Sequence, residues 1–246
     1  MVMRRLAFHE ALGVLGVGDL HPGGPSVTEV MLGELSKIDP RLVLEVGAGI
    51  GCTTARMLKR GWNVVALEPS DVLRRELERR LGVSAYPDPF ETFEGHAGPF
   101  DAIVGESAFY GMNVAGALEK VSRLLRHGGL FASLDMVWTD EADAAEVARI
   151  HDETKAVFGI PVASRTAWTW SDWQGAVRDA GFDEVFARRL PPDSLRADGS
   201  TKRRILTSAA RHPLAFLQHI NHRVKARKPR VPAGWTETWM AVWRRR

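Results

Sequence analysis

The chain has 246 residues, a hydrophobic fraction of 45% and a formal net charge of +3. This length suits one α/β domain with additions and a sizeable core. No apolar run reaches the ~18 residues of a membrane-spanning helix, and residues 1–9 lack the apolar stretch of a signal peptide. The single cysteine, Cys52, excludes an internal disulfide and is typical of a reducing compartment, so we expect a cytoplasmic protein.

Positive charge is concentrated late in the sequence. Residues 196–230 contain ten lysines and arginines and one acid, Asp198, which gives this segment +9 and leaves −6 for the rest of the chain. Such a segment can contact RNA phosphates, an anionic membrane surface or another anionic ligand, or it can be a solvated arm. The acidic remainder argues against RNA as the main substrate.

Residues 1–40 are predicted to be a helical lead-in that contains a turn at 21–25 (HPGGP). Ser26 or Thr28 is the expected cap of the next helix, which runs to about Lys37. From residue 41 onward, short apolar strands alternate with helices, which predicts a doubly wound, mostly parallel sheet. The expected strands cover 42–46, 63–67, 83–86, 101–105 and 130–134, and the expected helices cover 53–58, 70–81 and 114–126.

The second half departs from simple alternation. A helix over 141–158, a helix from a cap at Ser171 or Asp172 to about Ala180, and strands at 183–188 and 236–243 are expected. The roughly 45 residues between these strands are long for a loop, so we interpret 191–235 as an insertion with a helix over 209–224. We therefore expect a single domain over 1–246, in four parts: the 1–40 lead-in, a 41–190 cofactor-binding core, a 191–235 basic insertion or cap, and a last strand in 236–246.

A glycine-rich turn follows the first strand of the core. Gly47, Gly49 and Gly51 stand at alternate positions between this strand and a helix, a geometry that lets a nucleoside-bearing cofactor lie against bare backbone. The spacing differs from the G-x-G-x-x-G of dinucleotide sites. Glu45, just before the first glycine, would lie close to a pyrophosphate. The turn therefore favours a cofactor with a cationic amino-acid tail and no phosphate.

Two more acids follow neighbouring strands. Glu68 lies 21 residues after Gly47, where a carboxylate can accept both ribose hydroxyls of a nucleoside. NAD enzymes also place an acid there, so Glu68 indicates a ribose without choosing the cofactor. Asp88, between Pro87 and Pro89, is either an acceptor for an adenine amine or a turn residue.

Five stretches occur in a fixed order that is fairly specific as a set: 45–51 (EVGAGIG), 65–70 (VALEPS), 100–104 (FDAIV), 124–131 (LLRHGGLF) and 181–182 (GF). With these stretches the chain resembles the class I S-adenosylmethionine (SAM)-dependent methyltransferases over about residues 20–190 and again at 236–243. The resemblance implies SAM as cofactor and a seven-stranded sheet whose last strand is antiparallel. It also implies that Glu45 and the glycines lie near the methionine moiety, Glu68 near the ribose and Asp88 near the adenine.

The segment after the fourth expected strand, 105–112 (GESAFYGM), should face the transferred methyl group, because ligands bind at the carboxyl ends of strands. It lacks the Asn/Asp-Pro-Pro-Tyr motif of enzymes that methylate nucleic-acid or protein amides. It resembles the Glu-Ser…Met stretch of small-molecule methyltransferases, with Glu106 in the cofactor site. Tyr110 and Gly111 stand where those enzymes often have a histidine.

Methyl transfer to a hydroxyl or amine requires removal of a proton. Asp135, at the end of the fifth strand, is our first candidate base; its alternative role is to cap the following helix. Tyr110 is second, as a hydrogen-bond donor or a wall around the methyl group. His21 is third, and it is otherwise a turn residue.

Trp138, Trp168, Trp170 and Trp173 follow the fifth strand and can form either core packing or an aromatic wall for the acceptor. No residues have metal-ligand spacing, so we expect metal-independent transfer. The sequence thus predicts a SAM-dependent methyltransferase that acts on an oxygen or nitrogen of a small molecule. The alternatives are an RNA-directed methyltransferase that uses the basic segment and a non-catalytic module that binds SAM or a nucleotide.

Overall fold

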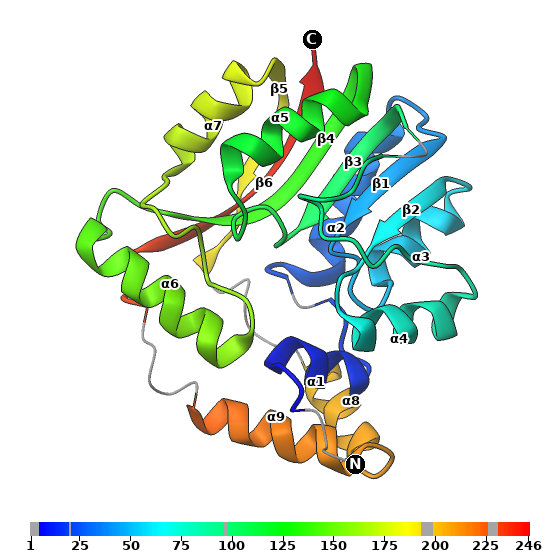
Figure 1. The fold of residues 1–246 in the computed structure, drawn as a ribbon, viewed down its shortest axis with the longest axis vertical. Helices are drawn as coiled ribbons and strands as arrows, with labels where there is room; N and C mark the ends of the chain where they lie inside the picture. Colours follow the sequence, from blue (N-terminus) through cyan, green and yellow to red (C-terminus); the bar gives the residue numbers. More distant parts are fainter. Residues whose placement is uncertain (1–4, 20, 96–97, 193–198, 226–230) are drawn as a thin grey trace.

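A computed structural model of the chain describes residues 5–19, 21–95, 98–192, 199–225 and 231–246. The strands of this part form one six-stranded sheet in the order β2-β1-β3-β4-β6-β5 (Figure 1). The pairs β1–β2, β1–β3 and β3–β4 are parallel, and β6 is antiparallel to both of its neighbours. The strands are β1 (Leu42–Val46), β2 (Asn63–Leu67), β3 (Phe100–Glu106), β4 (Leu125–Trp138), β5 (Phe182–Arg189) and β6 (Thr236–Arg245).

The strand expected at 83–86 is reduced to a single bridge, in which Tyr86 pairs with Leu67. Pro87 and Pro89 follow at once, and proline has no N–H to continue a ladder of hydrogen bonds. Seven strands are therefore not found in the described part of the chain, whereas the mostly parallel sheet and the antiparallel last strand are confirmed.

The helices occupy nearly the expected places, but two begin with different caps. Gly23, in the left-handed conformation, precedes α2, so neither Ser26 nor Thr28 is its cap. Thr169 caps α7 by accepting a hydrogen bond from the backbone N–H of Asp172. The helices are α1 (Phe8–Val14), α2 (Gly24–Ser36), α3 (Cys52–Lys59), α4 (Asp71–Leu81), α5 (Val114–Leu124), α6 (Ala144–Phe158), α7 (Trp170–Asp179), α8 (Gly199–Ala209) and α9 (Pro213–Lys225).

Both faces of the sheet are buried, as expected for a doubly wound fold. Because side chains alternate along a strand, Leu44 of β1 packs in the cluster under α5 and α7, and its neighbour Val43 packs in the cluster under α2. Polar strand-end residues such as Glu45 and Asp135 are buried with this core. The sheet thus holds the carboxyl ends of β1, β2, β3 and β4 at one edge in a fixed arrangement.

A helical cap is built from both ends of the sequence. The backbone N–H of Leu6 donates to Gln218 of α9, at 2.8 Å, and His222 of the same helix lies 2.9 Å from the Leu6 carbonyl oxygen. The Phe8 ring packs edge-on against Phe158 at the end of α6. Figure 1 shows α1, α8 and α9 together at the end of the molecule opposite the C-terminus. None of the described helices is long and apolar enough to cross a membrane.

Candidate functional site

A cavity of about 390 Å³ lies at the carboxyl ends of β1, β2 and β3. Its floor is the glycine turn after β1, and its walls include Glu68 and Ser107 from the ends of the next two strands. His9 of α1 and Ile160, just after α6, also line it. Its volume lies within the range of about 300–1,000 Å³ that is usual for small-molecule sites.

The three glycines of the turn have different tasks. All have positive φ, at 73° for Gly47, 57° for Gly49 and 81° for Gly51, which is a conformation that favours glycine. Gly47 and Gly49 line the cavity and present bare backbone to it. A Cβ at Gly51 would lie 2.9 Å from Cγ of Leu77, so this glycine lets the turn pack closely against α4.

Glu45 is buried at the floor of the cavity and accepts a 2.6 Å hydrogen bond from the hydroxyl of Thr54. Burial raises the pKa of this carboxyl from 4.5 to about 8, the Thr54 hydrogen bond opposes the shift, and the nearby charges of Glu106 and Glu68 add to it. A cation that bound here would favour the ionised carboxylate.

Glu68 is also buried, and it fixes the shape of the turn. Its two oxygens accept hydrogen bonds from the backbone N–H groups of Gly49, at 2.7 Å, and Ser70, at 2.8 Å. Burial raises the pKa of Glu68 to about 7 against the effect of these two hydrogen bonds. A carboxylate oxygen has two lone pairs, so each oxygen retains one for a ligand hydroxyl.

Glu106 joins the lead-in to the end of β3. One oxygen accepts a 2.7 Å hydrogen bond from Thr28 of α2, and the other accepts a 2.5 Å bond from Thr53 of α3. The ring of His21 contacts this group through Nε2, 3.5 Å from Glu106 and 3.2 Å from the Thr28 hydroxyl, while Nδ1 lies 3.2 Å from the Pro22 carbonyl oxygen. Both ring nitrogens of His21 therefore have partners. Sequence reasoning missed the two threonines, because no motif marks them.

Asp135 and Tyr110 are brought together beneath the cavity rather than in its lining. Asp135 is 3% exposed, and one of its oxygens accepts backbone hydrogen bonds from Phe109, at 3.2 Å, and Tyr110, at 3.4 Å. Its other oxygen is buried without a partner in the described part of the chain. Burial raises the pKa of Asp135 to about 7, and burial together with the Asp135 charge raises the pKa of the Tyr110 hydroxyl.

These contacts give Asp135 a structural task in the loop after β3. Ser107 begins this loop with a φ of 57° and donates its N–H to the carbonyl oxygen of Leu134, at 2.6 Å. Asp135 then holds the next residues by their N–H groups. The helix that follows β4 is capped by Asp143 instead. The role of Asp135 as a base stays a prediction.

Other candidates lie beside the cavity. Asp88 is not among the described lining residues, although Phe90 and Glu91, two and three positions later, are. Trp138, which ends β4, and the three tryptophans that follow at 168, 170 and 173 do not line it either. Trp138 donates its indole N–H to the carbonyl oxygen of Ser164, and Trp173 is buried under the sheet. At this cavity the tryptophans act as core and cap packing.

His9 is a lining residue that sequence reasoning missed. Its Nδ1 lies 3.3 Å from the carbonyl oxygen of Phe158, and since a carbonyl only accepts, Nδ1 carries the proton of this hydrogen bond. In the neutral ring, Nε2 then has a free lone pair, and Nε2 has no hydrogen-bond partner among the described residues. The ring packs against Gly159, where a Cβ would lie 3.0 Å from Nδ1. A histidine so close to the N-terminus has no local signal, because the cap forms only in three dimensions.

Known methyltransferases are similar in sequence to the part of the chain that forms the cavity. A family model described as a methyltransferase domain matches residues 44–131, which include the glycine turn, Glu68 and the loop after β3. The uncharacterized methyltransferase YodH of Bacillus subtilis is 21% identical over 198 residues, covering 78% of this chain and 82% of that protein. An uncharacterized methyltransferase of Mycobacterium tuberculosis is 30% identical over 153 residues, or 61% of this chain, and the match spans 60% of its own length.

Solved structures agree on the fold. A protein from Galdieria sulphuraria, assigned as a sarcosine dimethylglycine methyltransferase, superposes with a TM-score of 0.70 at 18% identity, covering 94% of this chain and 95% of that one. Geranyl diphosphate C-methyltransferase from Streptomyces coelicolor superposes with a TM-score of 0.63 at 15% identity, covering 91% and 79%. At these identities the likeness concerns the fold alone.

Proposed function

Since the chain belongs to the class I SAM-dependent methyltransferases, we propose that it binds SAM in the cavity above β1–β3 and transfers the methyl group to an oxygen or nitrogen of a small-molecule acceptor. Bound SAM supplies an electrophilic methyl group on a sulfonium centre. The residues of the cavity bind and orient this cofactor and accept the proton that the acceptor loses.

The observation that carries the proposal is the charge of the cavity. Glu45, Glu68, Glu91 and Glu106 line it, and the described lining residues include no lysine or arginine. A dinucleotide pyrophosphate would lie unpaired among these carboxylates, whereas a cofactor with an ammonium group and a sulfonium suits them. The acidic lining and the bare glycine backbone together fit SAM and disfavour NAD.

Three of these four carboxylates have a proposed role. Glu45 and Glu106, with Thr28 and Thr53 to hold the latter in place, support the methionine side of the cofactor. Glu68 accepts ribose hydroxyls with the lone pairs that its two backbone hydrogen bonds leave free. The adenine contact of Asp88 remains a sequence prediction, and the neighbouring Phe90 offers an aromatic wall in the same place.

For the proton of the acceptor, the geometry favours His9 over the candidates from sequence. His9 lines the cavity with a fixed tautomer and a free Nε2 lone pair, which is what a general base requires. Both nitrogens of His21 have partners, and Asp135 lies beneath the loop that it holds. We propose His9 as the base and Asp135 as the residue that positions the loop after β3.

The domain organisation and cellular location are also part of the proposal. We propose one methyltransferase domain over 1–246, in which residues 191–235 cap the 41–190 core. The lone Cys52 supports a cytoplasmic location. RNA-directed transfer is the competing hypothesis, and its signature is salt-sensitive RNA binding that is lost when Lys202, Arg203 and Arg204 are neutralised.

Titration calorimetry with SAM and with NAD tests the cofactor assignment, and we expect binding of SAM alone. Heat from NAD and none from SAM would overturn the proposal. Transfer is then measured with methyl-labelled SAM against panels of hydroxylated, amine-bearing and carbon acceptors. Carbon acceptors belong in the panel because one structural neighbour is a geranyl diphosphate C-methyltransferase. Product labelled only at carbon would contradict the oxygen or nitrogen assignment.

A further inference from the structure

The helices α8 and α9 expose more large apolar side chains than any other part of the described chain. Nine large hydrophobic residues are exposed in that part, and five of them lie on these two helices. They include the three most exposed ones, Leu206 at 67%, Leu217 at 62% and Val224 at 60%. Burial of a helical hairpin against its own domain normally removes such side chains from water, so their exposure indicates a surface for a partner.

The exposed residues of α9 form one stripe. Leu214, Leu217, Ile220 and Val224 recur every three or four positions, the spacing of a single helix face. The buried residues Ala215, His219 and His222 recur with the same spacing on the opposite face, where α9 meets α1. The helix therefore has two faces with different tasks, one that closes the cap and one that is free.

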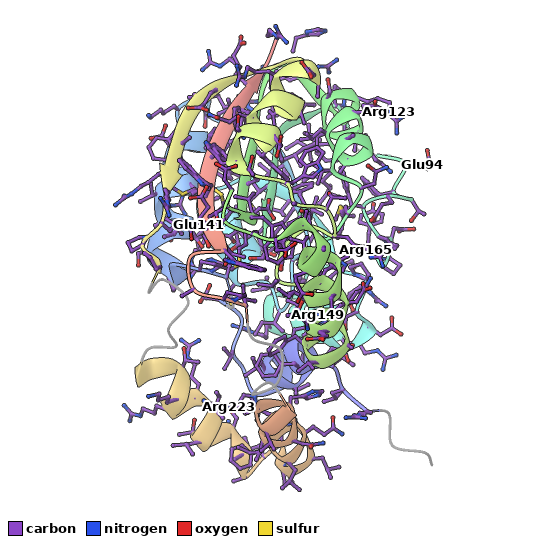
Figure 2. The ribbon with its side chains drawn as sticks, turned by 90° about the vertical axis from the view of Figure 1, so that its left-hand side faces the viewer. Glu94, Arg123, Glu141, Arg149, Arg165 and Arg223 are labelled. Carbon is purple, nitrogen blue, oxygen red and sulfur yellow. The ribbon has the colours of Figure 1, made fainter. Side chains whose placement is uncertain are left out.

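The hairpin that carries this stripe contains cations and no acids. Residues 199–225 contain six lysines and arginines and no aspartate or glutamate. On α8, Leu206 follows Lys202 and Arg203 by four and three positions, so the three share one face. Figure 2 places Arg223 of α9 at the capped end of the molecule, far from Arg123 of α5.

From this combination we propose that the α8–α9 hairpin docks on the surface of an anionic lipid bilayer. Exposed aliphatic side chains enter the boundary between headgroups and acyl chains, and the flanking cations pair with the anionic headgroups. The hairpin lies on the surface and does not cross the membrane. Because the docking face of α9 is opposite the face that contacts α1, bilayer binding leaves the cap over the cavity in place.

Charge and side-chain type favour an anionic bilayer over a second copy of the chain and over RNA. A second copy of the chain would bring an equally cationic hairpin against this one, and the like charges would repel. RNA pairs with cations, but it offers bases for aromatic stacking rather than an apolar layer for leucine and valine. This surface does not involve the methyl acceptor. The docking proposal can therefore be tested independently of the proposed function.

Co-sedimentation of the whole protein with phosphatidylcholine vesicles, with and without phosphatidylglycerol, tests the proposal. We expect binding only to the anionic vesicles. Lys202→Gln/Arg203→Gln should lower the partition coefficient roughly 10- to 30-fold, and Leu214→Ser/Leu217→Ser should lower it at least about tenfold. The matched controls, Arg123→Gln/Arg188→Gln and Val30→Ser/Val185→Ser, change two exposed cations and two exposed aliphatic side chains on other elements and should bind like the unchanged protein.

Three results would overturn docking by this hairpin. One is equal binding of the hairpin variants and their controls to anionic vesicles. Another is absence of binding to those vesicles by protein whose SAM affinity and circular dichroism are intact. The third is binding of single-stranded RNA that displaces the protein from the vesicles at the same ionic strength. If this RNA binding is lost in Lys202→Gln/Arg203→Gln but kept in Leu214→Ser/Leu217→Ser, the surface binds nucleic acid.

Discussion

The cofactor half of the cavity and its cap are built by different means. The cofactor half comes from three strand ends within 45–107, and most of its polar groups bond inside this stretch, as Glu68 does to Gly49 and Ser70. Glu106 also accepts a hydrogen bond from Thr28, 78 positions away. The cap joins α1 to α9 through contacts such as Leu6 with Gln218, which are separated by 212 positions. Local contacts leave a readable motif, and distant ones do not.

This difference also separates two functional tasks. The cofactor half has a fixed chemical partner, so its acids and glycines follow a shared pattern. In the proposed function the cap faces the methyl acceptor, and substrate-binding residues commonly lie on variable segments. We therefore expect substitutions in the cofactor half to change SAM binding, and substitutions in the cap to change turnover with little change in SAM affinity.

The largest expected effect is the loss of turnover caused by a substitution in the cap. His9→Gln removes the proposed base and should lower kcat by roughly 10²- to 10⁴-fold, with the dissociation constant of SAM changed less than about threefold. The measurement is single-turnover methyl transfer across a range of pH. Asp135→Asn is the comparison, because it keeps an oxygen that accepts the loop N–H groups. If Asp135→Asn abolished turnover and His9→Gln did not, Asp135 would be the base.

The next effect lies in the cofactor half. Glu68→Ala removes the ribose acceptor and releases the N–H groups of Gly49 and Ser70. The cost of a few kcal/mol corresponds to a rise of roughly 100-fold in the dissociation constant of SAM. Calorimetry measures it, and Glu119→Gln on the exposed side of α5 is the control. An unchanged dissociation constant would remove Glu68 from the site.

Glu45 should lower the stability of the ligand-free protein at high pH while strengthening SAM binding. Its folded-state pKa of about 8 lies above the ordinary 4.5, so its contribution to stability is fully present below about pH 4.5 and is lost as the pH rises through 8. Glu45→Gln removes this cost and keeps an acceptor for Thr54. It should stabilise the ligand-free protein by roughly 1–3 kcal/mol at about pH 9 while weakening SAM binding. Urea unfolding measures the first effect; lower stability of the variant at that pH would contradict it.

The last prediction, given per pH unit, is the pH dependence of cofactor binding. Glu45 and Glu68, with pKa values of about 8 and about 7, must lose protons to pair with a cation or to accept ribose hydroxyls fully. SAM affinity should therefore increase with pH, by up to about tenfold per unit for each proton released, and level off above about pH 8. Calorimetry in buffers of different ionisation enthalpy should detect proton release. Pyrophosphate ligands should show the opposite trend.

Sequence patterns predicted the core elements well, because burial and turn chemistry act locally. The strands β1 and β2 lie where the apolar runs predict them, and α4 covers the expected 70–81 except for Ser70, which caps it. The strand at 83–86 was predicted from the same kind of apolar run. The prolines that follow it limit its pairing to a single β-bridge. The helix expected over 209–224 is α9, which begins only at Pro213 because proline is tolerated in the first turn of a helix and disfavoured in its interior; a further helix, α8, precedes it over Gly199–Ala209.

By itself, the sequence determined the fold class, the glycine turn and the acids at the carboxyl ends of β1, β2 and β3, because each depends on residues close together in the chain. Only the tertiary structure decided which groups share the cavity. It placed Asp135 beneath the loop after β3, brought His9 to the cavity against Gly159, and exposed the aliphatic stripe of α9. These outcomes depend on packing between segments far apart in sequence, and no local pattern of residues encodes them.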